Sequence, residues 1–352
     1  MTAFLEALAE AIRSGEVDTD DRGRATEVLT DDLRVLHVTP GFVESRHVVG
    51  LFVDPRGKIK AVAKTPRRIH DDEGVQHEAT LLTRLHDLAP ELSATVPTVL
   101  AFTHWYGRPV LVESALAGTA LTHERARRHP SAVASIHDWI ARLPVTSRSS
   151  GTTMIEELLT PSLERLRQIT PADHPLRDVA ARTEETLHHI DDMDLPRPFE
   201  HGDPSHPNLM VTRDGCAQVV DWELANEHGA PGHDLAFFLG FTAFATRHAH
   251  GIPAEVAAFT DAFLQDDGPE ARLFTQGLQS AGVDAKAAGP LFVLAWARAS
   301  LRLIERLAPG LALGSVDDRA HVLAELERSR NTTLWVSAVT AGDGVMRVTQ
   351  SV

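Results

Sequence analysis

The chain has 352 residues, of which 43% are hydrophobic, and its formal net charge is −15. This length suits two lobes better than a single core. The acidic balance argues against nucleic acid as a partner, because phosphate binding needs clustered lysine and arginine. The surplus acid is compatible with attraction of a cationic substrate and also with an ordinary solvated surface.

Residues 1–18 predict an amphipathic helix, and they lack the basic start and unbroken apolar core of a signal peptide. The most apolar run, residues 235–245, is too short to span a bilayer, so no membrane partner is expected. The single cysteine, Cys216, cannot form an internal disulfide. A reducing cytoplasm is therefore the expected location.

Strand patterns come first along the chain and helical patterns follow. Residues 31–65 alternate like strands, with strands expected at 47–53 and 58–64, and another strand is expected at 108–114. Residues 74–88 have helical periodicity. Further helices are expected at 131–143, 175–193, 234–248, 253–265 and 289–307. A loop is expected at 147–153, and the last twenty residues receive no assignment.

This order of elements predicts an α+β fold with two lobes. The N-terminal lobe, residues 1–113, is expected to hold an antiparallel sheet. A hinge is expected at residues 114–119, and a larger, mainly helical lobe at residues 120–352.

The most informative stretch is the octapeptide HGDPSHPN at residues 201–208. Asp203 precedes Asn208 by five positions, and Asp221 follows a predicted hairpin that turns at Asp214-Gly215. This pattern suits metal-assisted phosphoryl transfer, in which one aspartate accepts the proton of the attacking hydroxyl. The asparagine and the later aspartate hold Mg²⁺, which usually takes one or two carboxylates plus substrate phosphates.

A lysine upstream matches this motif. Lys64 ends the strand Ala61–Lys64 and shares a face with Val62, so the valine can cover a flat base while the lysine reaches phosphate oxygens. Glu78 on the following helix can pair with Lys64. Taken alone, each of these residues is common in proteins. Only the order Lys, Glu, Asp, Asn, Asp along one chain indicates a nucleotide site. Lys64→Ala is expected to leave folding near normal, because the side chain would line a cleft.

Together these motifs resemble the aminoglycoside phosphotransferase family, within the wider protein-kinase-like fold that also includes choline kinases. The resemblance covers roughly residues 35–245 and also rests on the segments AVAK, HEATLLTRL, VLVESALAGTAL and VVDWE and on Asp234-Leu235-Ala236. The chain departs from protein kinases, because GFVESRH is not a G-x-G-x-x-G loop and Asp221 is followed by Trp-Glu. Protein substrates are therefore not expected.

The resemblance implies a role for each matching residue. Asp203 would be the catalytic carboxylate, and Asn208 and Asp221 would be Mg²⁺ ligands. Lys64, positioned by Glu78, would bind the α- and β-phosphates. The Ser114 carbonyl and the Leu116 amide would meet the purine edge, and residues 41–46, which include Ser45, would cover the phosphates.

The implied function is a small-molecule kinase that transfers the γ-phosphate of ATP or GTP to a hydroxyl of an antibiotic or sugar-like acceptor. Two alternatives remain open: a nucleotide-binding module without catalysis, and a kinase of a glycan or nucleoside-type biosynthetic intermediate. A zinc hydrolase built on histidines 201, 206, 228 and 233 would leave Lys64 and Glu78 unexplained.

Other polar residues receive structural interpretations. His201 is expected to brace the loop that carries Asp203, and Asp234 is expected to orient that loop from behind. Trp296, Arg298 and Arg302 have helical spacing and can border an acceptor pocket, but helix packing and solvated charge are the favoured interpretation.

Overall fold

The computed structural model describes residues 2–17, 22–38, 47–67, 73–265, 268–308 and 316–341. The chain packs into two compact units, one of residues 1–120 with 208–225 and the other of residues 121–207 with 226–352. Residues 208–225, which the sequence-based division left in the helical lobe, thus pack with the first unit. The division at a hinge of residues 114–119 stays a prediction.

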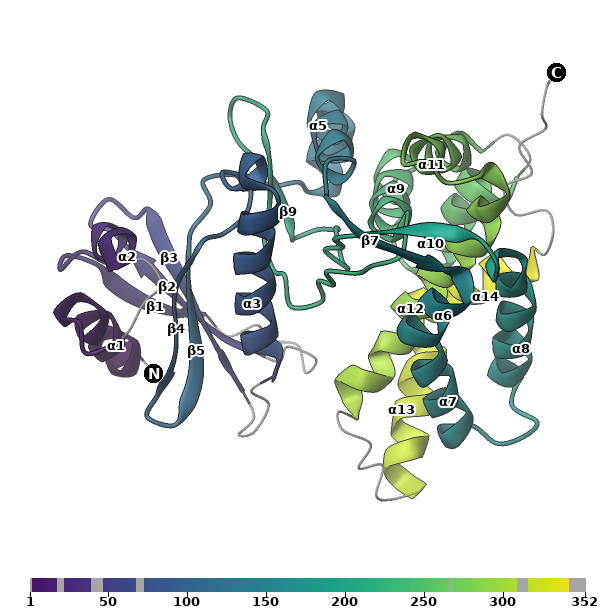
Figure 1. The fold of residues 1–352 in the computed structure, drawn as a ribbon, viewed down its shortest axis with the longest axis horizontal. Helices are drawn as coiled ribbons and strands as arrows, with labels where there is room; N and C mark the ends of the chain where they lie inside the picture. The colour runs from purple at the N-terminus through teal and green to yellow at the C-terminus, as the bar shows by residue number, and fades with distance from the viewer. Residues whose placement is uncertain are drawn as a thin grey trace. The chain divides into compact units, whose positions relative to one another are not determined.

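The first unit is built on a five-stranded antiparallel sheet with the strand order β1-β2-β3-β5-β4. The strands are β1 (Arg34–Val38), β2 (His47–Val53), β3 (Ile59–Pro66), β4 (Val99–Trp105) and β5 (Arg108–Ser114). Helices α1 (Thr2–Ser14) and α2 (Arg22–Val28) lie on one face and α3 (Glu73–Leu88) on the other (Figure 1). The predicted antiparallel sheet is therefore confirmed.

Alternation along β3 divides its side chains between the two faces of this sheet. Ala61 and Ala63 belong to the apolar core formed with α1 and α2. Val62 and Lys64 consequently point to the opposite face, which α3 covers. Glu113 on β5 is the register partner of Val62, so it lies on the same face as Lys64.

A smaller antiparallel sheet completes the first unit, with the order β10-β9-β6. Its strands are β6 (Thr119–Ala120), β9 (Leu209–Val211) and β10 (Ala217–Val219). The predicted hairpin is confirmed, and Gly215 takes a φ of 88° at its turn. The Gly118 amide donates to Gln218 Oε1 at 2.7 Å. A Cβ at Gly118 would lie 2.9 Å from Met210 Cβ, so only glycine fits this approach.

The second unit is mainly helical. Its helices are α4 (His123–Arg128), α5 (Pro130–Ile140), α6 (Gly151–Leu158), α7 (Thr160–Ile169), α8 (Pro175–Leu187), α9 (His233–Thr246), α10 (Ile252–Phe259), α11 (Pro269–Ser280), α12 (Ala288–Leu307), α13 (Val316–Arg328) and α14 (Arg330–Thr340). A π-helical segment, Thr260–Leu264, follows α10, and 3-10 turns lie at His188–Ile190 and Ala285–Ala287. Another 3-10 turn, Pro90–Leu92, belongs to the first unit. Helices α9 and α12 are the most buried and form the centre of its core.

Within the described residues, one helical stretch, Ala285–Leu307, is long and apolar enough to cross a membrane. In this structure, however, 83% of that window is buried inside the protein. Trp296 on this helix is 2% exposed and stacks on Phe237, with ring centroids 5.1 Å apart. The stretch is thus the central packing element of the second unit, and helix packing accounts for Trp296 as predicted.

One prediction about the second unit is wrong. Residues 147–153 are not a loop, because strand β7 (Val145–Ser150) pairs with β8 (Asp194–Pro198). The pairing partner is distant in sequence, so the polar composition of this ribbon hid it. Ser150 then caps α6 by accepting from the Thr153 amide at 3.1 Å. Part of the last twenty residues, which received no assignment from the sequence, belongs to α14, which reaches Thr340 and packs on α12.

Candidate active site

In the first unit one lysine ammonium lies among three carboxyl groups. Lys64 Nζ is 2.6 Å from Glu78 Oε1, 3.3 Å from Asp221 Oδ1 and 3.4 Å from Glu113 Oε1. The structure thus brings together Lys64, Glu78 and Asp221, which sequence reasoning selected. Glu113 is a fourth member that it did not select.

The premise of the Lys64→Ala prediction is wrong, because the Lys64 side chain is buried and only 7% exposed. Glu78 is fully buried. Truncation of the lysine would leave that carboxylate without its closest cation. Removing one partner of a buried ion pair typically costs about 3–5 kcal/mol. The expected result is therefore a substantial loss of stability in the first unit.

The pKa values in this cluster follow from burial and charge. Burial disfavours the ammonium of Lys64, but Glu113, Glu78 and Asp221 outweigh it and raise the pKa of Lys64 well above 10.5. Burial raises the pKa of Glu113 to about 8, against the attraction of Lys64. Lys64 is therefore charged and Glu113 protonated at neutral pH.

Glu78 also fixes the backbone that carries Asp221. Glu78 Oε1, which accepts from Lys64, accepts from the Trp222 amide at 2.9 Å as well. Asp221 has a φ of 68°, in the left-handed region that aspartate enters more readily than most residues. Trp222 is fully buried and donates from Nε1 to Val219 O at 3.2 Å. The Asp-Trp pair thus anchors the chain in the core while Asp221 faces Lys64.

Asn208 and Asp221 lie at the two open ends of the β9–β10 hairpin. The Val220 amide donates to the backbone oxygen of Asn208 at 3.0 Å. The Asp221 side chain is 41% exposed, which leaves it accessible to a ligand. Among the described residues, no group of three or more His, Cys, Asp or Glu side chains is arranged to hold a metal ion. An amide and a carboxylate oxygen nevertheless fit Mg²⁺, which completes its shell with substrate phosphates and water.

The predicted purine-binding segment begins where β5 leaves the sheet. The Ser114 amide donates to Thr98 O at 2.9 Å, and the Ser114 hydroxyl accepts from the Thr98 amide at 2.9 Å. The next amide, of Ala115, donates to Lys60 O at 3.0 Å. Leu116 follows in a segment that is neither helix nor strand. Ser45 lies outside the described residues.

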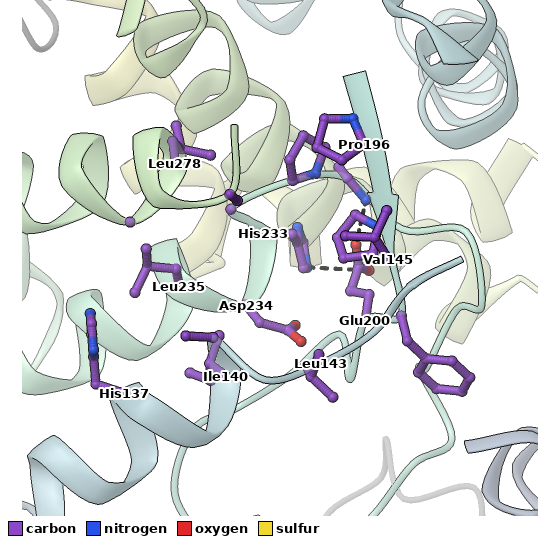
Figure 2. Close-up of a pocket in the computed structure, with 18 residues that line it drawn as sticks. His137, Ile140, Leu143, Val145, Pro196, Glu200, His233, Asp234, Leu235 and Leu278 are labelled. Atoms are coloured by element: carbon purple, nitrogen blue, oxygen red, sulfur yellow. Dashed lines mark hydrogen bonds and ion pairs between the residues drawn. The ribbon is translucent and has the colours of Figure 1, made fainter. Parts of the chain in front are cut away.

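In the second unit Asp203 lies on a segment that is held from behind by α9. Asp234 Oδ2 accepts from the His201 amide at 2.7 Å, and Asp234 Oδ1 accepts from the Gly202 amide at 2.9 Å. Asp234 and His233 both belong to the first turn of α9 (Figure 2). The His201 ring accepts at Nδ1 from the Asp203 amide at 3.2 Å, and Asp203 Oδ1 accepts from Ser205 Oγ at 2.7 Å. The predicted bracing by His201 and Asp234 is thus present.

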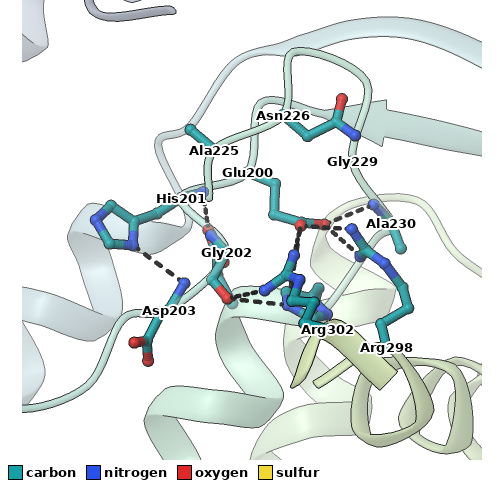
Figure 3. Close-up of polar contacts among 12 residues, drawn as sticks. Glu200, His201, Gly202, Asp203, Ala225, Asn226, Gly229, Ala230, Arg298 and Arg302 are labelled. Atoms are coloured by element: carbon teal, nitrogen blue, oxygen red, sulfur yellow. Dashed lines mark hydrogen bonds and ion pairs between the residues drawn. The ribbon is translucent and has the colours of Figure 1, made fainter. Parts of the chain in front are cut away.

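A buried ion cluster next to this segment was missed by sequence reasoning (Figure 3). Glu200 is 1% exposed and accepts from Arg298 at 2.7 and 2.8 Å and from Arg302 at 3.1 Å. Arg302 also donates to the Gly202 carbonyl. Burial opposes ionisation of Glu200, but the positive charges of Arg298 and Arg302 hold its pKa well below its usual range. The interpretation of Arg298 and Arg302 as solvated charge is therefore wrong.

The histidines near the motif serve as hydrogen-bonding groups. His228 Nδ1 lies 2.9 Å from the Thr146 hydroxyl, and His233 Nε2 lies 3.2 Å from Gly202 O. His201 Nδ1 accepts from a backbone amide, as described above. These three rings therefore have hydrogen-bonding partners, and the part of the chain that the structure describes has no group of three or more potential ligands arranged for a metal such as zinc.

A sequence model described as the phosphotransferase enzyme family, APH, matches residues 50–278, more than half of the chain. The chain belongs to this family. The prediction of a phosphotransferase is thereby confirmed. A search of curated proteins gave no match.

Solved structures with the kinase-like fold cover most of the chain. A macrolide 2′-phosphotransferase from Brachybacterium faecium shares 16% identity with a TM-score of 0.52, over 92% of this chain and 99% of that chain. A choline kinase from Streptococcus pneumoniae shares 12% identity with a TM-score of 0.50, over 92% and 99%. An ethanolamine kinase from Plasmodium vivax shares 11% identity with a TM-score of 0.51, over 86% and 84%. These similarities confirm the predicted protein-kinase-like fold.

Proposed function

We propose that this phosphotransferase moves the γ-phosphate of ATP or GTP to a hydroxyl group of a small molecule, with Mg²⁺ as its metal. The proposal rests on the buried ion pair between Lys64 and Glu78. The ammonium group of Lys64 also forms an ion pair with Asp221. A triphosphate requires a fixed cation and a carboxylate for its metal, and this cluster supplies both. Three carboxyl groups surround the single ammonium group of Lys64, and this excess of acidic groups favours binding of a metal cation.

In this proposal the first unit binds the nucleotide. Lys64, held by Glu78, contacts the α- and β-phosphates. Asn208 and Asp221 hold Mg²⁺, whose charge offsets that of the phosphates. The Ser114 carbonyl and Leu116 amide bind the purine edge. Ser45 belongs to the loop assigned to the phosphates.

Asp203 of the second unit acts on the acceptor. Its carboxylate accepts the proton of the acceptor hydroxyl, the hydroxyl oxygen forms a bond to the γ-phosphorus, and the nucleoside diphosphate leaves. The backbone hydrogen bonds from His201 and Gly202 to Asp234 support this role, because they fix the segment that carries Asp203. Such positioning is the main contribution a protein makes to phosphoryl transfer.

The acceptor class proposed is an antibiotic or sugar-like molecule, with a glycan or nucleoside-type intermediate as the alternative. The similar folds include enzymes named for macrolides, choline and ethanolamine, so this architecture accommodates acceptors of different chemistry. The net charge of −15 favours an acceptor that carries an amine. Use of a nucleoside triphosphate agrees with activity in the cytoplasm, where such nucleotides are abundant.

Thermal unfolding with nucleotide and metal tests the proposal. ATP or GTP with Mg²⁺ is expected to raise the melting temperature in a concentration-dependent manner, since a ligand at 100 times its Kd adds about 2.7 kcal/mol. Asp221→Ala should remove the Mg²⁺-dependent part of this increase. Asp214→Ala, at the exposed turn of the same hairpin, is the matched control and should keep it. No increase with either nucleotide at millimolar concentration would contradict the proposal.

A further inference from the structure

The second unit contains a cavity of about 190 Å³ that the proposed function does not use. It lies among the end of α5, the β7–β8 ribbon, the start of α9 and α11 (Figure 2). Its wall is largely apolar and includes Ile140, Leu143, Pro196, Leu235 and Leu278. An apolar protein cavity of about 150 Å³ is enough to bind benzene, so this one can hold a slightly larger ring system.

The carboxylates in the wall are already engaged. Glu200 accepts from two arginines and from the Ala230 amide at 3.0 Å. Asp234 accepts from two backbone amides with its two oxygens. A cationic ligand would therefore find no free acceptor of opposite charge there, and an anionic ligand would meet repulsion. The cavity favours an uncharged molecule.

Two histidines of this wall, His137 and His233, each have a buried ring nitrogen without a hydrogen-bond partner among the described residues. The contacts of His233 define which of its two nitrogens carries the proton. The ring is 1% exposed, and burial lowers its pKa well below 6.5, so it is neutral. Nε2 lies 3.2 Å from Gly202 O, and a carbonyl only accepts, so Nε2 carries the proton. Nδ1 is then a bare acceptor, and within the described part of the chain it has no hydrogen-bond partner. A buried acceptor of this kind favours a ligand with a donor.

We propose that this cavity binds a small, mostly apolar and uncharged molecule that carries one N–H or O–H donor, which bonds to His233 Nδ1. The site is coupled to the segment that carries Asp203. His233 bonds to the Gly202 carbonyl and Asp234 to the Gly202 amide, so a bound molecule contacts two of the residues that hold this segment.

Indole and benzofuran are the probes, because they have nearly the same shape and only indole has an N–H donor. Ligand-observed NMR and calorimetry on the full chain should show saturable binding of indole. Benzofuran should bind at least about tenfold more weakly, the loss expected for one hydrogen bond to a buried acceptor. Equal affinity of the two probes would overturn the proposal, as would no saturable indole binding at millimolar concentration. The comparison needs no variant.

Two substitutions locate the bound probe. Ile140→Trp fills the cavity from a half-buried position, and Val145→Trp does so from a position that is 54% exposed. Either should abolish indole binding while the protein keeps its melting temperature. Val133→Trp is the control, since it lies on α5 but does not line the cavity, and it should bind indole normally. Indole binding that survives in both folded cavity variants would place the probe elsewhere.

Discussion

Glu113→Gln tests the charge state of the Lys64 cluster. The folded-state pKa of Glu113 is about 8, against 4.5 for an ordinary glutamate. The folded protein therefore binds one more proton than the unfolded chain between these pH values, and its stability falls as pH rises through this window. At about 1.4 kcal/mol per pH unit, the loss is on the order of 5 kcal/mol.

Glutamine keeps the shape of the protonated carboxyl group but cannot ionise. The stability of the variant should therefore not fall with pH in this window. The free energy of unfolding of Glu113→Gln, relative to wild type, is expected to rise from about pH 5 and level off above about pH 8. Denaturant titrations at several pH values measure the difference. Tryptophan fluorescence is a suitable signal, because the buried Trp222 belongs to the same unit.

Glu91→Gln is the matched control, because Glu91 is an exposed carboxyl group of the same unit. It should leave the pH dependence unchanged. A difference between Glu113→Gln and wild type that stays constant with pH would refute the reasoning. A difference that falls with pH would mean that Glu113 is ionised and stabilised by Lys64.

Two further predictions concern the cluster around Glu200. Glu200→Gln leaves the buried Arg298 without its anion and should cost about 3–5 kcal/mol in denaturant unfolding, whereas Glu157→Gln, on a carboxylate that is 55% exposed, should cost about 1 kcal/mol or less. Equal costs would contradict the assignment. Gly229→Ala would place a Cβ 2.4 Å from Glu200 Cβ, so it should destabilise the protein and combine non-additively with Glu200→Gln. Additive effects in the double variant would show that Gly229 acts independently.

Local sequence patterns were sufficient to predict the strands and turns whose geometry depends on residues close together in the chain. Alternation placed Val62 and Lys64 on one face of β3, and the Asp214-Gly215 turn defined the hairpin that ends at Asp221. In both cases the periodicity or the turn residue directly determines the geometry. The pairing of Glu78 with Lys64 was expected from the order of these residues along the chain, and the structure places Glu78 among the buried residues of α3.

Contacts between residues far apart in the sequence could not be predicted from local patterns. Glu200 and Arg298 are separated by 98 residues, and only the folded chain brings them together. A signal was present, since Arg298 interrupts an otherwise apolar run of α12, and an arginine at such a position usually has a buried partner. Glu113 gave a similar signal at the end of the apolar strand β5. The β7–β8 ribbon gave none, because its polar residues resemble a loop.

The central claim is that Asp203 performs chemistry on a bound acceptor. The most direct measurement pairs calorimetry of Mg²⁺-nucleotide binding with mass spectrometry of acceptors, for wild type and Asp203→Asn. The acceptor panel contains aminoglycosides, macrolides, choline, ethanolamine, nucleosides and sugars. Wild type is expected to add one phosphoryl group to an acceptor. Asp203→Asn should bind nucleotide with little change but transfer phosphate about a hundredfold or more slowly. Wild-type transfer by Asp203→Asn would contradict the account.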